Sequence, residues 1–363
     1  MTYERLNISK MRGYTPGEQP AQDDIIKLNT NENPYPASPL VAEVLASVKV
    51  ADLRRYPSPV AASFRSEAAA YHNVEPENIV PTNGGDELLR LAITTFANKG
   101  DTIGIAEPSY SLYPVLAEVQ ECHLQKIPLD DDWLLPGDIA EQLNDADAKI
   151  AFLVNPHAPT GMLLSADRIA AIAKNFNGVL VIDEAYVDFV DPTLNYDLVP
   201  LINSCNNLLI LRTLSKGYSL AGLRFGYGIG AQSLIDPILN KTRDSYNTDA
   251  ISQQLATAAI SSVEHARLSW DKVRQERERL AQALKLLGFN CLPSQSNFLL
   301  AKVPGELNAE SIYHALKQQN ILVRYFDQLR LDDRLRITVG TAEENTRLLY
   351  AVGQLLKTTE SIT

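Results

Sequence analysis

The sequence has few cysteines and no long hydrophobic run, and both shortages narrow the class of protein. Its three cysteines lie far apart in the chain, at Cys122, Cys205 and Cys291. They form neither a disulfide framework nor a CxxC metal pair. No apolar segment follows the opening MTYERLNISK as in a secretion signal, and no run reaches the length of a membrane span. We therefore expect a cytoplasmic protein with reduced thiols and no membrane segment.

Positive charge is also scarce. Lysine and arginine number 33 against 44 aspartates and glutamates, which gives a formal net charge of −11. Such a chain has no basic field to attract polyphosphate, so we expect neither nucleic acids nor acidic membranes as partners. The five histidines show no metal-ligand spacing, so no metal site is expected.

The remaining composition is that of a folded protein. Hydrophobic residues make up 45% and charged residues 21%, and 363 residues suggest two or three domains. The first 35 residues are rich in Pro, Gly and Asn, which predicts an extended N-terminal arm over 1–35. A helix is predicted from Ser38, which can cap it, with Pro39 at the first helical position.

Short apolar runs alternate with helical stretches between residues 51 and 250. The runs are nearly continuous in Val, Ile and Leu, which suits strands that helices bury on both faces. This alternation predicts an α/β fold in which a doubly wound, mostly parallel seven-stranded sheet forms a large domain. The seven strands are predicted in NIVPTN, DTIGIAEP, HLQKIPL, KIAFLVNP, GVLVIDEAY, NLLILRTLS and RFGYGIG.

The pattern becomes helical after residue 249. A long helix is predicted over 263–287, with Gly288 as its C-cap. Short strands and helices follow, and they predict a smaller α+β domain made of residues 36–50 and 263–363.

Ligands of doubly wound sheets bind beyond the carboxyl ends of the strands, and four such ends carry polar residues. One is a Gly-Gly turn, with Gly85 and Asp86 at the start of a helix. Another ends on Asn155, and a third ends on Asp183 with Tyr186 three residues later. The fourth is followed by Thr213, Ser215, Lys216 and Arg224.

This set of side chains is what pyridoxal phosphate requires. The Lys216 amine can form a Schiff base with an aldehyde, and a buried carboxylate such as Asp183 can keep a pyridine nitrogen protonated. Asn155 and Tyr186 can both hydrogen-bond a ring oxygen. A phosphate is held by amides at a helix start, by hydroxyls and by an arginine, supplied here by Gly85, Asp86, Thr213, Ser215 and Arg224.

Each of these residues taken alone also has a plainer interpretation. Asp183 could cap a helix, Lys216 could lie at the surface, and Arg224 could form a salt bridge. Asn155 could simply form a turn. Their coincidence at consecutive strand ends favours the cofactor site.

Several blocks resemble a known family. NPHAPTG, VIDEAYVDF and RTLSKGYSLAGLRFGYGIG resemble the signature blocks of the fold-type I pyridoxal-phosphate aminotransferases. Further blocks, spread in order over nearly the whole chain, resemble those of histidinol-phosphate aminotransferases. They are LNTNENPYPASP, RRYPSP, TNGGDELL, EPSYSLYP, SNFLL and LRITVGT. The chain departs at His157 and Ala158, where the family usually shows two asparagines, and at Gly85, where serine or alanine is common. Because Asn155 is kept, the resemblance still implies cofactor binding.

The resemblance also implies a role for each matched residue. Lys216 would form the Schiff base and move the proton, and Asp183 would pair with the ring nitrogen. Asn155 and Tyr186 would hold the ring oxygen, while Tyr110 would stack on the ring face.

Two further tyrosines have implied roles outside the cofactor ring. Tyr56, in RRYPSP, would reach the cofactor phosphate of a neighbouring subunit, which implies a homodimer with shared active sites. Tyr14, in the arm, would close over the substrate.

The resemblance implies a reaction that converts L-histidinol phosphate and 2-oxoglutarate to imidazole acetol phosphate and L-glutamate. Arg336 would bind the anionic group of each amino substrate through a bidentate pair. A phosphate ester carries nearly two charges, so a second cation is useful, and Arg324 is placed to supply it. Alternatively, Arg324 could form a salt bridge with Asp327.

Other functions of the same fold remain open at this point. An aromatic-amino-acid aminotransferase and a threonine-phosphate decarboxylase share much of the pattern. A ligand-sensing regulator without catalysis is a third alternative. Regulators of that kind carry an additional DNA-binding domain, and the arm shows neither a helix-turn-helix pattern nor a basic patch.

Overall fold

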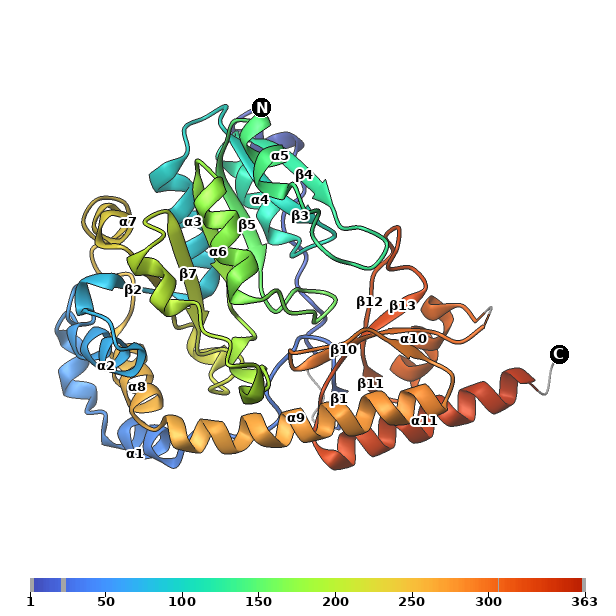
Figure 1. The fold of residues 1–363 in the computed structure, drawn as a ribbon. Coiled ribbons are helices and arrows are strands. Elements are labelled where there is room, and N and C mark those ends of the chain that lie inside the picture. The colour runs from blue at the N-terminus through green and yellow to red at the C-terminus, as the bar shows by residue number, and fades with distance from the viewer. Residues whose placement is uncertain (1–2, 21–23, 306, 361–363) are drawn as a thin grey trace.

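The structure is a computed structural model that describes residues 3–20, 24–305 and 307–360. The chain forms a large α/β part and a small α+β part (Figure 1). The long helix α9 (Val263–Leu286) runs along one edge of the molecule from the large part to the small part. The N-terminal arm, dark blue in Figure 1, passes between the two parts.

A seven-stranded sheet forms the centre of the large part. Its strand order is β2-β8-β7-β6-β5-β3-β4, and β8 runs antiparallel to both of its neighbours while the pairs from β7 to β4 are parallel. The prediction of a doubly wound, mostly parallel sheet is confirmed, and each predicted run contains one strand. The strands are β2 (Ile79–Thr82), β3 (Thr102–Glu107), β4 (His123–Pro128), β5 (Ala148–Val154), β6 (Val179–Asp183), β7 (Leu208–Thr213) and β8 (Gly226–Gly230).

Helices bury both faces of this sheet. Successive residues of a strand face opposite sides, and in β6 Leu180 and Ile182 join one hydrophobic cluster while Val181 joins the other. One face packs against α3 (Gly84–Phe96), α4 (Leu112–Val119) and α7 (Gln232–Pro237). The other packs against α2 (Ala62–His72), α5 (Ile139–Asp145), α6 (Ala166–Asn175) and α8 (Ala250–Ser261). Burial on both faces is why these strands are apolar throughout rather than alternating.

The small part is built on a four-stranded antiparallel sheet. Its order is β12-β13-β10-β9, and a hydrophobic cluster of its own lies beneath it. The arm contributes β1 (Ile26–Lys27), which pairs in parallel with β11 (Ile321–Leu322) and so fixes the arm to this part. The other elements are β9 (Asn290–Cys291), β10 (Phe298–Lys302), β12 (Arg324–Tyr325), β13 (Arg334–Thr338), α10 (Ala309–Gln318) and α11 (Ala342–Glu360).

Helix α1 (Pro39–Ser47) begins where the sequence predicts it. The Ser38 hydroxyl accepts a hydrogen bond from the Leu40 backbone amide at 3.3 Å, which caps the helix. The helix packs against α8, and its buried Val41 belongs to the core of the large part. This contact differs from the assignment of residues 36–50 to the small domain, because the apolar side of α1 covers α8. We propose that this segment belongs with the large part.

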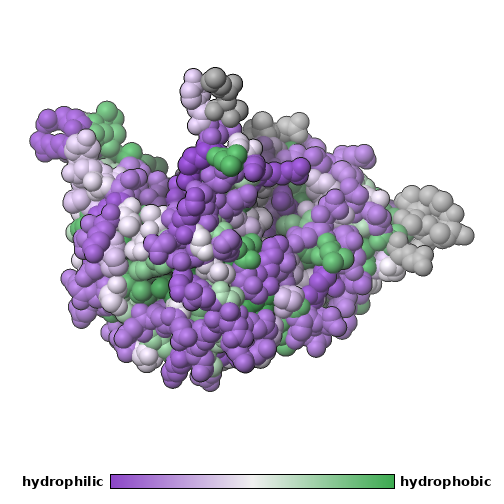
Figure 2. Space-filling view, turned by 90° about the horizontal axis from the view of Figure 1, so that it is seen from above, coloured by the Kyte–Doolittle hydropathy of each residue, from purple (hydrophilic) through white to green (hydrophobic). Residues whose placement is uncertain are grey.

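The outer surface agrees with the composition. Seen from above, it is mostly hydrophilic with scattered hydrophobic patches (Figure 2). Within the described ranges, no helix is long and apolar enough to cross a membrane.

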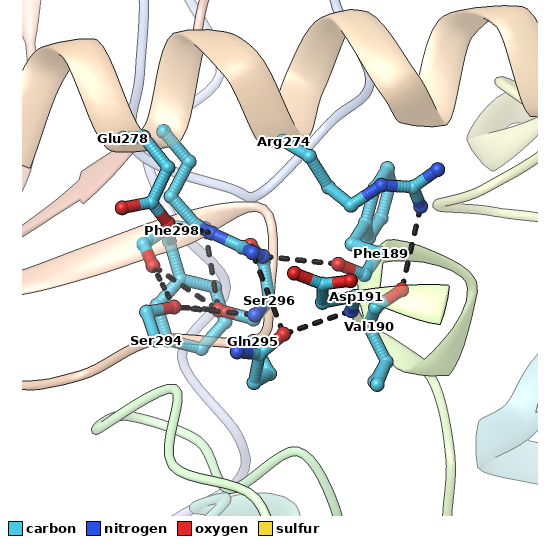
Figure 3. A network of polar contacts seen from close by, with 10 residues as sticks. Phe189, Val190, Asp191, Arg274, Glu278, Ser294, Gln295, Ser296 and Phe298 are labelled. Carbon is cyan, nitrogen blue, oxygen red and sulfur yellow. Dashed lines mark hydrogen bonds and ion pairs between the residues drawn. The ribbon is translucent and has the colours of Figure 1, made fainter. Parts of the chain in front are cut away.

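A buried arginine ties α9 to two loops, the one after β6 and the one before β10. Arg277, only 2% exposed, donates hydrogen bonds to the carbonyl oxygens of Phe189 and Ser296, each at 3.0 Å. Gln295 Oε1 accepts from the Asp191 backbone amide at 2.9 Å, so the loop after β6 and the loop before β10 are also joined directly. Figure 3 shows these loops converging below the helix.

We expect Arg277→Met to destabilise the protein. The methionine keeps the apolar stem but leaves two buried carbonyl groups without donors, so the free energy of unfolding should fall by about 3 kcal/mol. Urea denaturation measures this change. The control is Arg267→Met on the same helix, where a half-exposed ion pair with Glu264 is lost and a change below about 0.5 kcal/mol is expected. Equal losses for both variants would contradict the anchoring role of Arg277.

Candidate active site

A cavity of about 360 Å³ lies at the carboxyl ends of the parallel strands, where the two parts of the chain and the arm meet. Most of the predicted site residues line it, and Asn155 and Tyr56 do not. Further lining residues that the sequence analysis did not place in the site include Asn29, Thr30, Asn31, Ser109 and Phe326. The predicted residues at the cavity wall are Tyr14, Gly85, Asp86, Tyr110, Asp183, Tyr186, Thr213, Ser215, Lys216, Arg224, Arg324 and Arg336.

Lys216 lies in the loop that follows β7 and projects its amine into the cavity. Its Nζ donates a hydrogen bond to the backbone carbonyl of Thr30 at 2.8 Å. Burial, and then the nearby positive charge of Arg336, lowers the pKa of Lys216 to about 8. A larger fraction of this amine is therefore neutral near pH 7 than for an exposed lysine, and the neutral amine is the nucleophile.

Asp183 ends β6 and is held by two donors. Its Oδ2 accepts from the Tyr113 hydroxyl at 3.0 Å, and its Oδ1 accepts from the Ala185 backbone amide at 3.1 Å. Burial raises the pKa of Asp183 to about 6, and both hydrogen bonds oppose that rise. Tyr113 is itself fully buried and stacked on Phe152, with ring centroids 5.2 Å apart. The sequence analysis missed Tyr113, although it stands in the same EPSYSLYP block as Tyr110.

One end of the cavity is suited to an anion. Thr213 Oγ1 donates to Ser215 Oγ at 2.9 Å, and both hydroxyls lie at the wall. The Arg224 guanidinium packs against Gly84 at the start of α3, where a Cβ atom would come within 2.6 Å of Nη2. Gly84 also has a φ of +74°, so a side chain is excluded on both grounds. Arg224 Nη2 also lies 3.4 Å from Asp86 Oδ2, and this contact orients the guanidinium.

Two further arginines at the cavity wall, Arg324 and Arg336, form no ion pair with an acid among the described residues. Arg336 Nη2 donates to the Asn29 carbonyl at 3.0 Å, and its guanidinium lies over the rings of Phe298 and Phe326. Arg324 lies over Phe326, with Cζ 5.3 Å from the ring centroid. Among the ion pairs of the described residues, neither arginine has an acidic partner, so the alternative pairing of Arg324 with an acid is not present. Two unneutralised guanidiniums at a cavity wall are suited to a ligand anion.

Asn155 differs from most of the predicted site residues because it does not line the cavity. Its Nδ2 donates to the Leu164 carbonyl at 3.1 Å and to the Tyr196 hydroxyl at 2.7 Å, and its Oδ1 accepts from the Leu164 amide at 2.8 Å. The side chain is fully buried, and these bonds close the loop after β5. Its amide protons and its oxygen are thus engaged within the protein, and Asn155 does not line the cavity. That it binds the cofactor or the substrate stays a prediction. The residues of this loop that line the cavity are Ala158 and Pro159.

Tyr14 and Tyr56 differ in their position relative to the cavity. Tyr14 of the arm meets Tyr110 edge to face, with ring centroids 5.7 Å apart, and both line the cavity. Tyr56 is 81% exposed and stacks on Tyr246, with ring centroids 4.5 Å apart, outside the cavity of its own chain.

The chemistry of the wall fits pyridoxal phosphate. It presents an amine, a buried carboxylate, an aromatic face and a set of hydroxyl and guanidinium donors. The hydroxyls of Thr30 and Ser109 are buried and have no hydrogen-bond partner in the protein, so they are available to a ligand. Throughout the described part of the chain, no group of three or more His, Cys, Asp or Glu side chains could hold a metal ion.

Comparisons with known proteins agree with this chemistry. The sequence profile for aminotransferase class I and II matches residues 23–352. The chain is 42% identical over 356 residues to histidinol-phosphate aminotransferase 1 of Trichormus variabilis, covering 98% of this chain and 99% of that protein. It is 41% identical over 341 residues to histidinol-phosphate aminotransferase of Rhodopirellula baltica, covering 94% and 92%.

The fold has close structural neighbours as well. The crystal structure of histidinol-phosphate aminotransferase from Sinorhizobium meliloti, in complex with pyridoxal-5'-phosphate, superposes with a TM-score of 0.87. The alignment covers 99% of both chains at 21% identity. This likeness supports the fold.

We expect Tyr113→Phe to raise the pKa of Asp183 further above about 6. The variant removes a donor that favours the charged carboxylate, so the carboxyl group should stay protonated to a pH about one unit higher. NMR of isotope-labelled aspartate side chains in the ligand-free protein measures this titration. Tyr71→Phe, at a half-buried tyrosine on α2 that makes no hydrogen bond to Asp183, is the control and should leave the titration in place. An unchanged Asp183 midpoint in Tyr113→Phe would show that the hydrogen bond does not tune this group.

Proposed function

The chain belongs to the class I and II aminotransferase family, and from this premise we propose that it exchanges the amino group of L-histidinol phosphate with 2-oxoglutarate. The products are imidazole acetol phosphate and L-glutamate. The observation that carries the proposal is the pair of unneutralised arginines, Arg324 and Arg336, at the cavity wall of a chain whose relatives at about 40% identity bear that name. We also propose a cytoplasmic location, because both substrates are small diffusible metabolites.

Pyridoxal phosphate, the cofactor of this family, supplies an electron-accepting pyridine ring when bound. Lys216 would hold its aldehyde carbon covalently and, once released by substrate, move the proton at the substrate α-carbon. Its lowered pKa suits both tasks, because the amine must be neutral to attack and to accept a proton. Asp183 would keep the ring nitrogen protonated, and Tyr110 would cover one ring face.

The anionic end of the cofactor would lie against Thr213, Ser215 and Arg224. These side chains lie beside the start of α3, where backbone amides point outward and the helix dipole favours negative charge. Gly85 would contribute only its backbone amide. The Asp86 side chain contacts the guanidinium, so its role would be to orient Arg224 rather than to touch the phosphate.

The substrate anion would lie at the other end of the cavity, on Arg336 and Arg324. A carboxylate can form a bidentate pair with Arg336 alone. A phosphate ester carries nearly two charges and gains more from the second guanidinium, which is why this pair favours histidinol phosphate over an aromatic amino acid with its singly charged carboxylate. Tyr14 would close the cavity from the arm.

We also propose a homodimer. Tyr56 is exposed and lies outside the cavity of its own chain, as expected for a side chain that serves the cofactor phosphate of a partner subunit. Neighbouring exposed apolar residues give that surface an area to bury, and they include Leu45, Val50, Leu53 and Tyr246.

Single-turnover measurements on the cofactor-loaded protein test the proposed substrate. Loss of the visible absorbance of the cofactor should be at least about a hundredfold faster with histidinol phosphate than with phenylalanine or tyrosine, about 2.7 kcal/mol of discrimination. Lys216→Ala is the control and should not react. Comparable rates with the aromatic amino acids would make the protein an aromatic aminotransferase. Release of carbon dioxide from threonine phosphate would make it a decarboxylase.

The two arginines should differ in their effects. Arg336→Ala should lower kcat/KM for glutamate on the order of a hundredfold, because a bidentate pair is lost, and should exceed the effect of Arg324→Ala. Arg324→Ala should lower kcat/KM more for histidinol phosphate than for glutamate, since the phosphate carries the greater charge. Arg347→Ala, an exposed arginine on α11, is the matched control. Small and equal effects on both substrates would place the anion elsewhere.

A further inference from the structure

A short segment of the arm touches three functional side chains at once. The carbonyl of Asn29 accepts from Arg336, and the carbonyl of Thr30 accepts from Lys216. Next in the chain, Asn31 Nδ2 donates to the Tyr186 hydroxyl oxygen at 3.1 Å. The sequence analysis assigned no role to these three residues, and all of them line the cavity.

Asn31 is held rigidly from the small part. It is 1% exposed and has a φ of +56°, a left-handed conformation that asparagine tolerates better than most residues. Its backbone carbonyl accepts from Asn297 Nδ2 at 2.9 Å, and its backbone amide donates to Thr338 Oγ1 at 3.0 Å. The Thr338 hydroxyl in turn donates to Asn31 Oδ1 at 3.1 Å.

These bonds fix which way the Asn31 amide faces. The Thr338 oxygen already accepts a proton from the Asn31 backbone, and its single hydroxyl proton needs an acceptor. Asn31 Oδ1 is that acceptor, so the NH₂ group must point at Tyr186. The Tyr186 oxygen thus receives a proton from Asn31 and cannot donate its own in that direction.

Tyr186 is left with one proton to donate, and it faces the cavity. Its ring is held edge to face against Phe298, with centroids 5.0 Å apart. Among the described residues, its hydroxyl makes no hydrogen bond besides the one from Asn31. Of the pair predicted to hold the cofactor ring oxygen, Asn155 and Tyr186, only Tyr186 lines the cavity.

We propose that Asn31 is a positioning residue that commits the Tyr186 hydroxyl to donate to the ring oxygen of the cofactor. Such a donor draws electron density from the ring oxygen, which then holds the neighbouring proton at the Lys216 nitrogen less tightly. The visible absorbance of the bound cofactor reports that proton. The inference rests on cofactor binding at this site and not on the identity of the substrate.

Asn31→Asp tests the proposal, because a carboxylate of nearly the same shape accepts from Tyr186 and turns its proton away from the cavity. In the cofactor-loaded protein without substrate, the pH midpoint of the visible absorbance should rise by about one unit, the size expected for one lost hydrogen bond. Asn31→Gly, which suits the left-handed backbone, should produce a smaller rise because the hydroxyl becomes free to rotate.

Two controls separate this role from a charge effect and from a folding defect. Asn33→Asp adds the same charge two residues away, at a side chain bonded to Gly217 and Ser269, and should leave the midpoint unchanged. In a Tyr186→Phe background, Asn31→Asp should add less than about a third of its shift, because the hydroxyl through which it acts is gone.

The outcomes are distinct. An equal shift of the midpoint in the Tyr186→Phe background, or none in either single variant at Asn31, overturns the positioning role. Failure of the unmodified protein to take up the cofactor with a visible absorbance would overturn the proposed function instead. Thermal unfolding of each cofactor-free variant identifies a variant that has simply failed to fold.

Discussion

An excess of positive charge at the cavity wall is the constraint on which the rest of the site depends. Lys216, Arg224, Arg324 and Arg336 all reach its wall, against the two carboxylates of Asp86 and Asp183. Desolvated charges of one sign are costly unless partners balance them. The cavity therefore favours ligands that bring anionic groups. The attraction is local, because the whole chain carries a net charge of −11.

Aromatic rings rather than acids hold Arg324 and Arg336 in place. Phe298 and Phe326 lie against the guanidinium of Arg336, and Phe326 also lies against Arg324. A ring face attracts a cation without filling its hydrogen-bond donors. An acid in the same place would have neutralised the guanidinium and competed with the substrate. The arrangement keeps the donors oriented and still free for an incoming anion.

The sequence was informative where chemistry follows directly from position along a strand. A buried strand must be apolar throughout, so the first polar residues after it mark the sheet edge, and this rule found Asp183, Thr213, Ser215 and Lys216. It could not give the direction of a side chain within a loop. Asn155 has the right residue type and place but uses its amide to close its own loop.

Contacts between segments far apart in the chain also could not be predicted from the sequence. Tyr113 reaches Asp183 across 70 residues and Asn31 reaches Tyr186 across 155, and no local pattern encodes either pair. Nor could the apolar side of α1 reveal which of two cores it covers. Periodicity reports that a face is buried, not what buries it.

The arm is what makes one site out of two parts. Strand β1 fixes it to the small part by pairing with β11, and four residues later Asn31 is bonded to Thr338 of β13. Between these anchors the carbonyl of Thr30 takes the amine of Lys216 from the large part. Any shift of the small part would therefore move a hydrogen-bond acceptor away from the nucleophile as well as moving Arg336. The distance between the Lys216 amine and the Arg336 guanidinium is thus set by the packing between the parts, to which the buried Arg277 on α9 contributes.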